Sequence, residues 1–408
     1  MREFFEVVTL EQASSHLTRF QRVGTERVSL ADATGRVVAA TVRSDIDLPG
    51  FRRSTMDGFA VDAASTFGAS ESSPALLDVR GTIEMGAQAE IQIERGQAAR
   101  ILTGGMLPPG ADSVVMIEHT EALDDSTIEV TRSVAPGQHV IEADEDLARG
   151  DALIVRGSRL RPQDIGLLAA LGREQVEVFR RPIVAILSTG DEIVPVGARP
   201  ARGQVRDVNS HTLSAMVAEA GGEPRQLGIV SDDLDQLTRV SRDALADADT
   251  VIISGGSSVG SRDLTLDLIA GLPDSELLFH GVAIKPGKPT ILARVGAAAF
   301  WGLPGHVASA MVVFRVLVRP FLEHVGGAHG SRSDLPVPAL LSRNVSSPHG
   351  RRDYIRVQLE ERDGELLAVP VLGKSGLIRT MVAADGVVEI DVNTEGLDAG
   401  ARVRVLRW

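Results

Sequence analysis

The sequence predicts a multidomain protein of the α/β-plus-β class, built around one doubly wound, mostly parallel α/β domain. In residues 182–330, apolar strand-like runs alternate with amphipathic helical stretches. That alternation is typical of a parallel sheet with helices on both faces. Residues 46–139 and 331–408 instead carry short alternating stretches separated by Gly, Pro and Asp, which favour small β domains. A chain of 408 residues, 43% of them hydrophobic, has room for two to four such domains.

The N-terminal segment has the pattern of a helix. Thr9 is a suitable cap, and Leu10, Ala13 and Leu17 follow at helical spacing, so we expect residues 9–40 to be helical.

The next segment is predicted to be an inserted β domain. The stretches AEIQIE, SVVMIE and STIEVT alternate apolar and polar residues within 46–139. Residues 140–180 then return to a helical pattern, with Pro162 at a helix start. We therefore expect a discontinuous helical domain, 1–45 and 140–181, that is interrupted by the β domain.

The α/β domain shows its elements in order. PIVAILS, RQLGIV and TVIIS read as buried strands, each followed by a helix: SHTLSAMVAEA, capped by Asn209 and closed by Gly221 and Gly222, then DDLDQLTRVSRDAL, then LTLDLIAGL. LLFHGVAI, TILARV and AAFWGL read as further strands before the long helix HVASAMVVFRVLVRPFLEHV. YIRVQLE, LLAVPVL and ARVRVLR predict the strands of a C-terminal β domain, 331–408.

Composition narrows the function. The formal net charge is −13 and no Lys/Arg-dense run occurs, which argues against nucleic-acid binding. There is no cysteine, so disulfides, iron–sulfur clusters and thiolate zinc sites are excluded. No apolar run has the length of a membrane span, and the first residues lack the apolar core of a signal peptide. We expect a cytoplasmic protein that acts on a small molecule.

The residues that follow the predicted strands are glycines, acids and two lysines. Ligands of doubly wound sheets bind beyond the carboxyl ends of the strands, so these residues should converge on one site. They are Ser188, Thr189, Gly190 and Glu192 after the first strand, Asp232 and Asp233 after the second, Gly255, Gly256, Ser257 and Asp263 after the third, Lys285 and Lys288 after the fourth, and Pro304, Gly305 and His306 after the last.

These residue types suit an anionic ligand and a metal ion. Glycine allows close backbone approach with N–H groups turned towards an anion, and lysines neutralise oxyanions. Carboxylates beside a phosphate repel it unless a hard cation bridges them, so the acids predict Mg²⁺. Each feature also has a purely structural interpretation: Asp232 or Asp233 as a helix cap, and the glycine pair as a tight turn. Their recurrence at one end of successive strands favours a site.

The glycine-rich stretch VIISGGSSVGSRDLT needs its own explanation. Neither the phosphate-loop pattern GxxxxGK[ST] nor the dinucleotide pattern GxGxxG occurs in the chain. The stretch does contain G-x-S-x-G around Ser258, a pattern of hydrolase nucleophiles. A hydrolase would also need a His and an orienting acid, and His306 is the only His at a strand end. We therefore treat a serine hydrolase as a minor alternative.

Three loops outside the α/β domain are also candidates. FRRSTMDGFAV contains Asp57, RILTGGMLPPGAD contains Thr103, and GQHVIEADEDLARGD contains Asp144, Glu145 and Asp146. The structural interpretation of each is an ordered or solvated turn.

Seven motifs together resemble one family, the molybdopterin molybdenumtransferases, known as MoeA proteins and as the E domain of gephyrin. The motifs are STMDGFAV, RILTGGMLPPGAD, EDLARGD, LSTGDE, SGGSSVGSRD, IKPGKP and GLPG, in the family's order over nearly the whole chain. The resemblance implies four domains: a discontinuous helical domain, an inserted β domain, a MogA-like molybdopterin-binding α/β domain and a C-terminal β-barrel. It also implies a homodimer whose site lies between the α/β domain of one subunit and the β-domain loops of the other.

The resemblance further implies a reaction and its residues. The family hydrolyses adenylylated molybdopterin with Mg²⁺, releases AMP and leaves molybdenum from molybdate on the dithiolene. Transient contact with other molybdenum-cofactor biosynthesis proteins is implied as well. Glu192, Asp232 and Asp263 would hold the metal. Carried over by motif, the catalytic residues would be Asp57, Thr103, Asp146, Glu192, Asp232, Asp263, Lys285 and Lys288.

One loop departs from the family's pattern. Pro-Gly-Asn-Pro is usual after the last strand, whereas this chain has Pro304-Gly305-His306-Val307. Two alternatives to the transferase therefore remain: a non-catalytic molybdopterin-binding paralogue, and a related nucleotide-pyrophosphate hydrolase.

Overall fold

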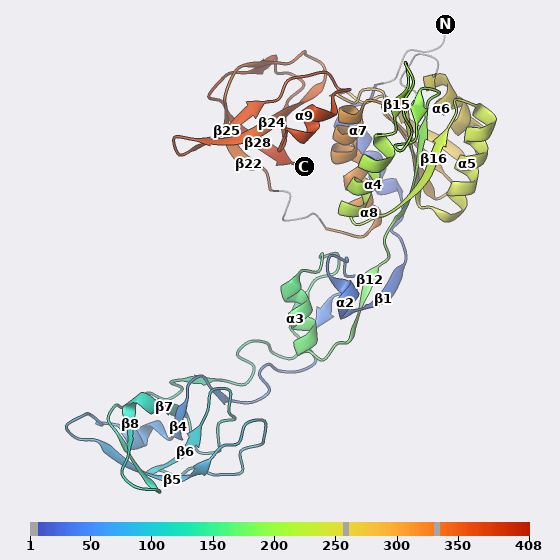
Figure 1. Cartoon of the computed structure of the whole chain (residues 1–408). Coiled ribbons are helices and arrows are strands. Elements are labelled where there is room, and N and C mark those ends of the chain that lie inside the picture. Colours follow the sequence, from blue (N-terminus) through green and yellow to red (C-terminus); the bar gives the residue numbers. More distant parts are fainter. Residues whose placement is uncertain (1–6, 256–260, 330–334) are drawn as a thin grey trace. The chain divides into compact units, whose positions relative to one another are not determined.

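The computed structural model describes residues 7–255, 261–329 and 335–408 (Figure 1). The chain divides into two compact units. The first unit comprises Met1–Ala40, Arg156–Gly166 and Arg173–Trp408, and the second comprises Thr41–Val155 and Leu167–Gly172. The predicted class, α/β plus β in several domains, is confirmed.

A six-stranded sheet forms the centre of the first unit. Its order is β16-β13-β17-β21-β20-β18. The first four strands are parallel, and β20 is antiparallel to both of its neighbours. The carboxyl ends of β13, β17 and β21 therefore lie at one edge of the sheet. The strands are β13 (Ile183–Thr189), β16 (Glu223–Val230), β17 (Thr250–Gly255), β18 (Ser275–His280), β20 (Ile291–Val295) and β21 (Ala298–Leu303).

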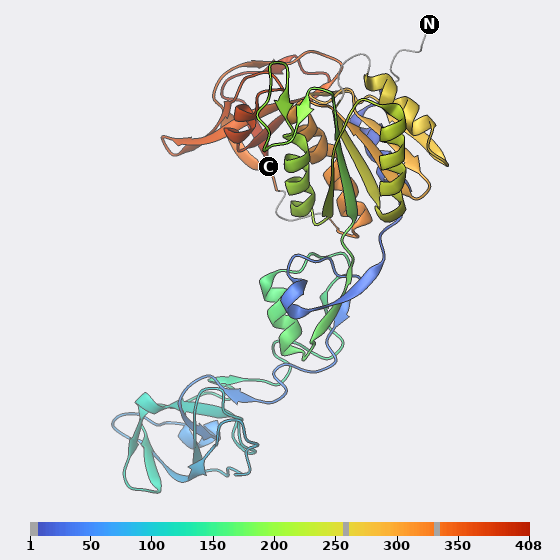
Figure 2. The ribbon, with the colours of Figure 1, turned by 45° about the vertical axis from the view of Figure 1, so that its right-hand side comes forward.

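Helices cover both faces of this sheet, as expected from the alternation in the sequence. Figure 2 shows α4 (Asn209–Glu219) and α5 (Leu234–Asp247) on opposite sides of it. On the α5 side, side chains from β13, β17 and β21 pack with α5 and with α6 (Ser261–Ala270).

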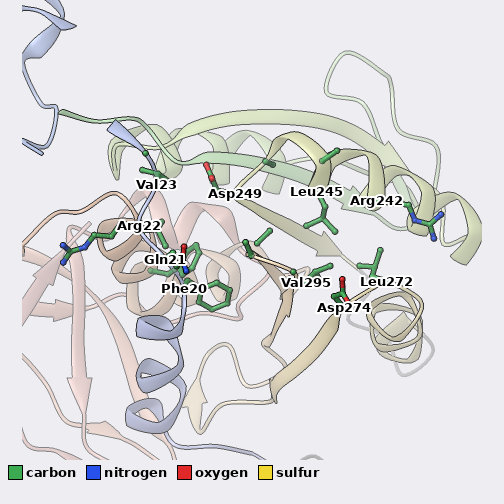
Figure 3. Close-up of a pocket in the computed structure, with 18 of the residues that line it drawn as sticks. Phe20, Gln21, Arg22, Val23, Arg242, Leu245, Asp249, Leu272, Asp274 and Val295 are labelled. Carbon is green, nitrogen blue, oxygen red and sulfur yellow. The ribbon is translucent and has the colours of Figure 1, made fainter. Parts of the chain in front are cut away.

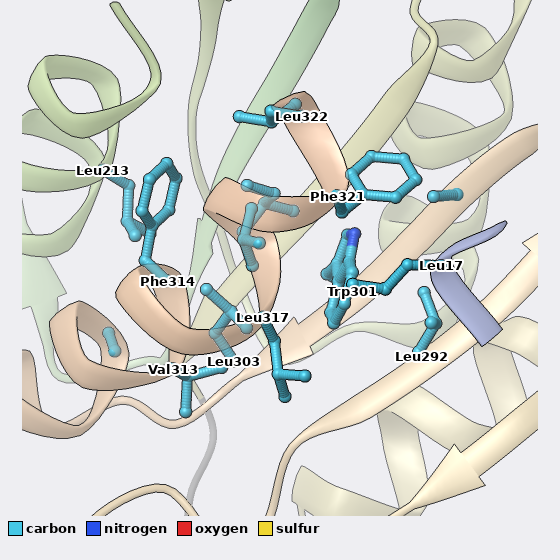
Figure 4. Packing of buried hydrophobic residues seen from close by; sticks show 14 of the residues in the cluster. Leu17, Leu213, Leu292, Trp301, Leu303, Val313, Phe314, Leu317, Phe321 and Leu322 are labelled. Carbon is cyan, nitrogen blue, oxygen red and sulfur yellow. The ribbon is translucent and has the colours of Figure 1, made fainter. Parts of the chain in front are cut away.

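The α4 face is closed by a long helix. It runs as α7 (Val307–Val313), a π-helical turn (Phe314–Val318) and α8 (Arg319–Val325). Figure 4 shows Trp301 of β21 beside Phe321 of α8, with ring centroids 5.7 Å apart. Both side chains are at most 1% exposed, so this cluster anchors the strand that leads into the candidate site.

The N-terminal segment is only partly helical, so the prediction for residues 9–40 is wrong beyond its first turns. Thr9 does cap α1 (Leu10–Ser15), in a capping box with Gln12, and a 3₁₀ turn follows. β1 (Thr25–Ser29) then pairs antiparallel with β12 (Gln175–Phe179), and α2 is only four residues long. Pairing with a strand about 150 residues away overrides the local helical pattern.

The prediction of helix over 140–180 is also too broad. Pro162 begins α3 (Pro162–Ala170), as expected. The remainder forms short strands, β10 (Val140–Ile141), β11 (Ala152–Ile154) and β12, each paired with a strand from the N-terminal part of the chain. Through these pairs, backbone hydrogen bonds connect the segment after the inserted β domain with the segment before it.

The C-terminal region forms a closed five-stranded barrel. The strands are β22 (Val337–Leu341), β24 (Arg352–Arg362), β25 (Glu365–Pro370), β26 (Gly386–Ile390) and β28 (Arg402–Arg407), and the pairing of β24 with β26 closes the ring. α9 (Ile378–Val382) lies between β25 and β26 in sequence. A two-residue strand from the α/β region, β19 (Ile284–Lys285), adds to β24. LLFHGVAI is therefore divided between the two sheets instead of forming one strand.

The second unit is built on a sheet of order β7-β4-β6-β5-β9-β8. Two predicted strands, SVVMIE and STIEVT, correspond to β7 (Ser113–Met116) and β9 (Thr127–Val130). AEIQIE is not a strand: Ala89 and Ile93 are buried, but the segment makes no ladder. The other strands are β4 (Gly58–Val61), β5 (Ala75–Thr82), β6 (Gln97–Ile101) and β8 (Thr120–Ala122). In the described part of the chain, no helix has the length and apolar character of a membrane span.

Candidate active site

A buried carboxylate joins the end of β13 to the start of α4. The Ser188 hydroxyl donates to Asp207 Oδ1 at 2.9 Å, and the Ser210 N–H donates to the same oxygen at 3.1 Å. Asp207 is 6% exposed and Ser188 is fully buried. Because both donors are fixed by secondary structure, the orientation of this carboxylate is fixed as well.

Asn209 links two further strand ends. We expected it to cap α4, and that prediction is wrong, because Val208 occupies the N-cap position and Asn209 is the first helical residue. Its Nδ2 instead donates to Ser254 Oγ at 2.7 Å and to the Gly305 carbonyl at 2.8 Å. The tertiary structure thus uses the asparagine to hold the ends of β17 and β21 together.

The two acids after β16 have different partners. The Thr189 hydroxyl donates to Asp232 Oδ1 at 2.7 Å. Asp233 is the N-cap of α5, and its side chain accepts from the Gln236 N–H at 2.8 Å. Asp233 is therefore the helix cap that the sequence allowed for either acid, whereas Asp232 lies beside the end of β13.

Two predicted glycines have different structural reasons. A Cβ on Gly255, whose φ is +144°, would lie 1.8 Å from the Thr189 carbonyl oxygen. Glycine at this position therefore lets the loop after β17 approach the end of β13. Gly190 has a φ of +146°, a backbone conformation that disfavours any side chain, whereas its nearest neighbour is the movable Glu192 carboxylate.

These strand ends surround one pocket of about 480 Å³, a size typical of small-molecule sites. Five predicted site residues line it: Ser188, Glu192, Gly255, Gly305 and His306. Asn209, which the sequence predicted only as a helix cap, lines it as well. Asp207 lines it too, although the sequence analysis did not predict it as a site residue.

A slightly larger pocket, of about 530 Å³, lies at the opposite edge of the sheet (Figure 3). It adjoins Asp249, just before β17, and Val295, the last residue of antiparallel β20. None of the predicted site residues lines it. Arg22, Arg180 and Arg242 do line it, and Arg180 is paired with Asp249 at 2.5 Å. Convergence of polar groups, more than volume, favours the pocket at the carboxyl edge.

His306 connects this pocket to the C-terminal domain. Its Nδ1 lies 2.8 Å from Ser375 Oγ, and the Ala308 N–H donates to the Ser375 carbonyl at 3.1 Å. Gly376 and Ile378 line the same pocket. The histidine at the position where the family usually has Asn is therefore held by a residue of the barrel domain.

Lys285 is engaged in an ion pair. Its Nζ lies 2.6 Å from Oδ2 of Asp353, a residue of β24 whose side chain is 2% exposed. The Ser347 hydroxyl donates to the same oxygen at 3.3 Å. Lys288 is exposed and lies outside the pocket lining. Sequence reasoning missed Asp353, because nothing in YIRVQLE or its neighbours indicates a partner 68 residues away.

The structure describes the side-chain surroundings of two of the three proposed metal ligands, Glu192 and Asp232. Glu192 lines the pocket and is exposed, and among the described residues no donor contacts the second carboxylate oxygen of Asp232. Asp263 is the third residue of α6. Gly256, Ser257 and the alternative nucleophile Ser258 lie outside the described residues. Carboxylate oxygens are the ligands that Mg²⁺ prefers, so the type of these side chains suits that ion. Among the described residues, however, no three metal-binding side chains lie close enough together to hold a metal.

The second unit carries the remaining candidates. Asp57 Oδ1 accepts from the Thr103 N–H at 2.7 Å and from the Thr103 hydroxyl at 2.8 Å. These two bonds, the backbone one first, lower the pKa of the Asp57 carboxyl. Asp146 is exposed, while the neighbouring Glu145 accepts from the Glu142 N–H within its own turn. Asp57 is thus held ionised and outward-facing.

Comparison with known families covers almost the whole chain. Residues 8–172 match the MoeA N-terminal region (domain I and II), residues 185–324 match a probable molybdopterin binding domain, and residues 338–408 match the MoeA C-terminal region (domain IV).

Individual relatives are similar over their full length. A molybdopterin molybdenumtransferase of Bacillus subtilis is 33% identical over 98% of this chain and 94% of its own. One from Haemophilus influenzae is 31% identical over 98% of each chain. A crystal structure of a molybdopterin biosynthesis MoeA protein from Pyrococcus horikoshii superposes with a TM-score of 0.87 at 30% identity, covering 99% of this chain and 100% of that one.

Proposed function

This chain belongs to the MoeA family of molybdopterin molybdenumtransferases, and from that premise we propose that it inserts molybdenum from molybdate into adenylylated molybdopterin with release of AMP. The observation that carries the proposal is the pocket at the carboxyl edge of the sheet. Ser188, Ser254 and Gly305, from the ends of three strands, are joined around it by the side chains of Asp207 and Asn209.

The residues of the pocket divide into two chemical groups. The glycines after β13 and β17 leave backbone accessible to a phosphate, and the apolar walls suit a planar ring. Glu192, Asp232 and Asp263 would hold Mg²⁺, which when bound stabilises negative charge on phosphate oxygens. Lys285, whose ammonium group is held by the ion pair with Asp353, and Lys288 would interact with the negatively charged oxygens of phosphate or molybdate. Electrostatic stabilisation of the leaving AMP is then the main source of rate.

The proposal is tested by incubating the protein with adenylylated molybdopterin, molybdate and Mg²⁺. We expect AMP release that requires the metal, and a product that reconstitutes an apo-molybdoenzyme. Chelation with EDTA should stop both, and added Mg²⁺ should restore both. AMP release without reconstitution would identify a nucleotide-pyrophosphate hydrolase instead. Tight binding of the substrate with neither product would identify a non-catalytic molybdopterin-binding protein.

We also propose that the protein works as a homodimer in which Asp57, Thr103 and Asp146 of one subunit complete the site of the other. The exposed, ionised Asp57 supports this role, since its own unit supplies it with no cation among the described residues. A further proposal is transient contact with other molybdenum-cofactor biosynthesis proteins, which supply the substrate and accept the product.

Subunit complementation tests the shared site. Mixing Asp57→Ala with Asp232→Asn subunits should regain activity, because each heterodimer contains one site with neither substitution. About half of the wild-type activity per heterodimer is expected from counting sites in a two-fold dimer. Subunit exchange is verified by mass spectrometry with one subunit isotopically labelled. Exchange without any recovery would place all of these residues in the site of a single chain.

A further inference from the structure

Asp207 presents one unused acceptor to the pocket. The Ser188 hydroxyl and the Ser210 N–H both donate to Oδ1. In the part of the chain that the structure describes, no donor contacts Oδ2. The residue is 6% exposed and lines the cavity, so the small accessible part of this carboxylate faces the space that a ligand would fill. Oδ2 is accessible from the pocket, so it can accept a hydrogen bond from a ligand there.

The residues around Asp207 indicate which kind of ligand could supply that donor. Val205 and Val208 line the pocket with Ile378 of the C-terminal domain. Arg206, which directly precedes Asp207, lines it too, and its Nε donates to the Val196 and Ala198 carbonyls. Gly255 and Gly305 line the same space without side chains. Apolar side chains and bare backbone suit a planar ring, and Asp207 lines the same space.

We propose that Asp207 is a specificity residue that accepts hydrogen bonds from the N–H edge of the ligand's heterocycle. On the proposed function, from which the ring's identity is taken, this edge is the 2-amino-4-oxo pyrimidine edge of the pterin, where the amino group and a ring N–H are adjacent donors. A carboxylate offers only acceptors, so it favours a ring with donors at this edge and rejects one that presents a carbonyl.

The orientation of the carboxylate makes the proposal testable by a single substitution. In Asp207→Asn, the amide oxygen is needed by Ser188 and Ser210, which both donate. The amide nitrogen is therefore turned towards the pocket, and the site presents a donor where it had an acceptor. The variant keeps the volume and the internal hydrogen bonds, so its specificity should change while its fold persists.

The experiment is a fluorescence titration of the full-length protein with pterin-6-carboxylate and with its 2-oxo counterpart, lumazine-6-carboxylate. The wild type should bind the pterin about 10- to 100-fold more tightly, the range expected for a hydrogen bond to a charged group. Asp207→Asn should reverse the order and favour the lumazine. Asp233→Asn is the matched control: it removes the same charge from a residue outside the pocket lining, and Asn also caps helices well. It should keep the wild-type preference.

Two outcomes would overturn the inference. One is a wild type that does not distinguish the two rings, including one that binds neither. The other is an Asp207→Asn variant that weakens both ligands equally, which would indicate a structural or metal-holding role. Neither outcome bears on AMP release from the complete substrate. Conversely, a protein that discriminates the rings but releases no AMP would contradict the proposed transferase reaction while leaving the role of Asp207 intact.

Discussion

Asp232→Asn should lower Mg²⁺-dependent AMP release by about a hundredfold or more, whereas Asp233→Asn should leave it within about twofold of wild type. The two residues are adjacent and the two substitutions are chemically identical, so only position distinguishes them. Asp232 lies against Thr189 at the end of β13, and asparagine there still accepts the threonine hydroxyl. Asp233 caps α5, and its carboxylate accepts a hydrogen bond from the Gln236 N–H.

The measurement is the rate of AMP release at saturating Mg²⁺ and again across a Mg²⁺ titration. If Asp232 holds the metal, its variant should also require a higher Mg²⁺ concentration for half-maximal rate. Equal losses in the two variants would show that the charge of the loop matters more than a specific ligand. An unaffected Asp232→Asn enzyme would remove this residue from the metal site.

Lys285→Met should destabilise the protein as well as inactivate it. The substitution leaves Asp353, which is 2% exposed, without its cation. Loss of a partner in a fully buried pair costs roughly 3 to 5 kcal/mol; Lys285 is 41% exposed, so we expect about 2 to 3 kcal/mol. The urea midpoint of the C-terminal barrel should fall accordingly, as followed by hydrogen exchange of amides in β24 and β26.

The double variant Lys285→Met/Asp353→Asn separates the two roles of the lysine. A neutral amide needs no cation, so the double variant should recover most of the lost stability. Its AMP release should stay at least about tenfold below wild type, because no positive charge is left to meet the ligand. Recovery of both stability and activity would show that Lys285 serves only to neutralise Asp353. A single variant as stable as wild type would contradict the importance of the ion pair.

Much of the candidate site follows from the order of residues along the chain. The carboxyl ends of parallel strands share an edge, so locating the strands by their apolar runs was enough to bring Ser188, Gly255 and Gly305 together. The same reasoning failed where a side chain's partner is distant. Asp232 and Asp233 are adjacent acids, and their partners distinguish them: Thr189 from β13 contacts Asp232, whereas Asp233 accepts from the Gln236 N–H of its own helix.

Features that depend on near neighbours follow from the sequence without the fold. They are the helix cap at Thr9, the helix start at Pro162, the alternation of strands and helices in 182–330, and the glycines after the strands. The tertiary structure alone decided the rest. It made residues 25–29 a strand by pairing them with residues 175–179, turned Asn209 from a helix cap into a link between two strand ends, and set Lys285 against Asp353. Local propensities are worth a fraction of a kcal/mol per residue, whereas buried hydrogen bonds and ion pairs left unmade cost several times more, so distant partners override local preference wherever burial brings them together.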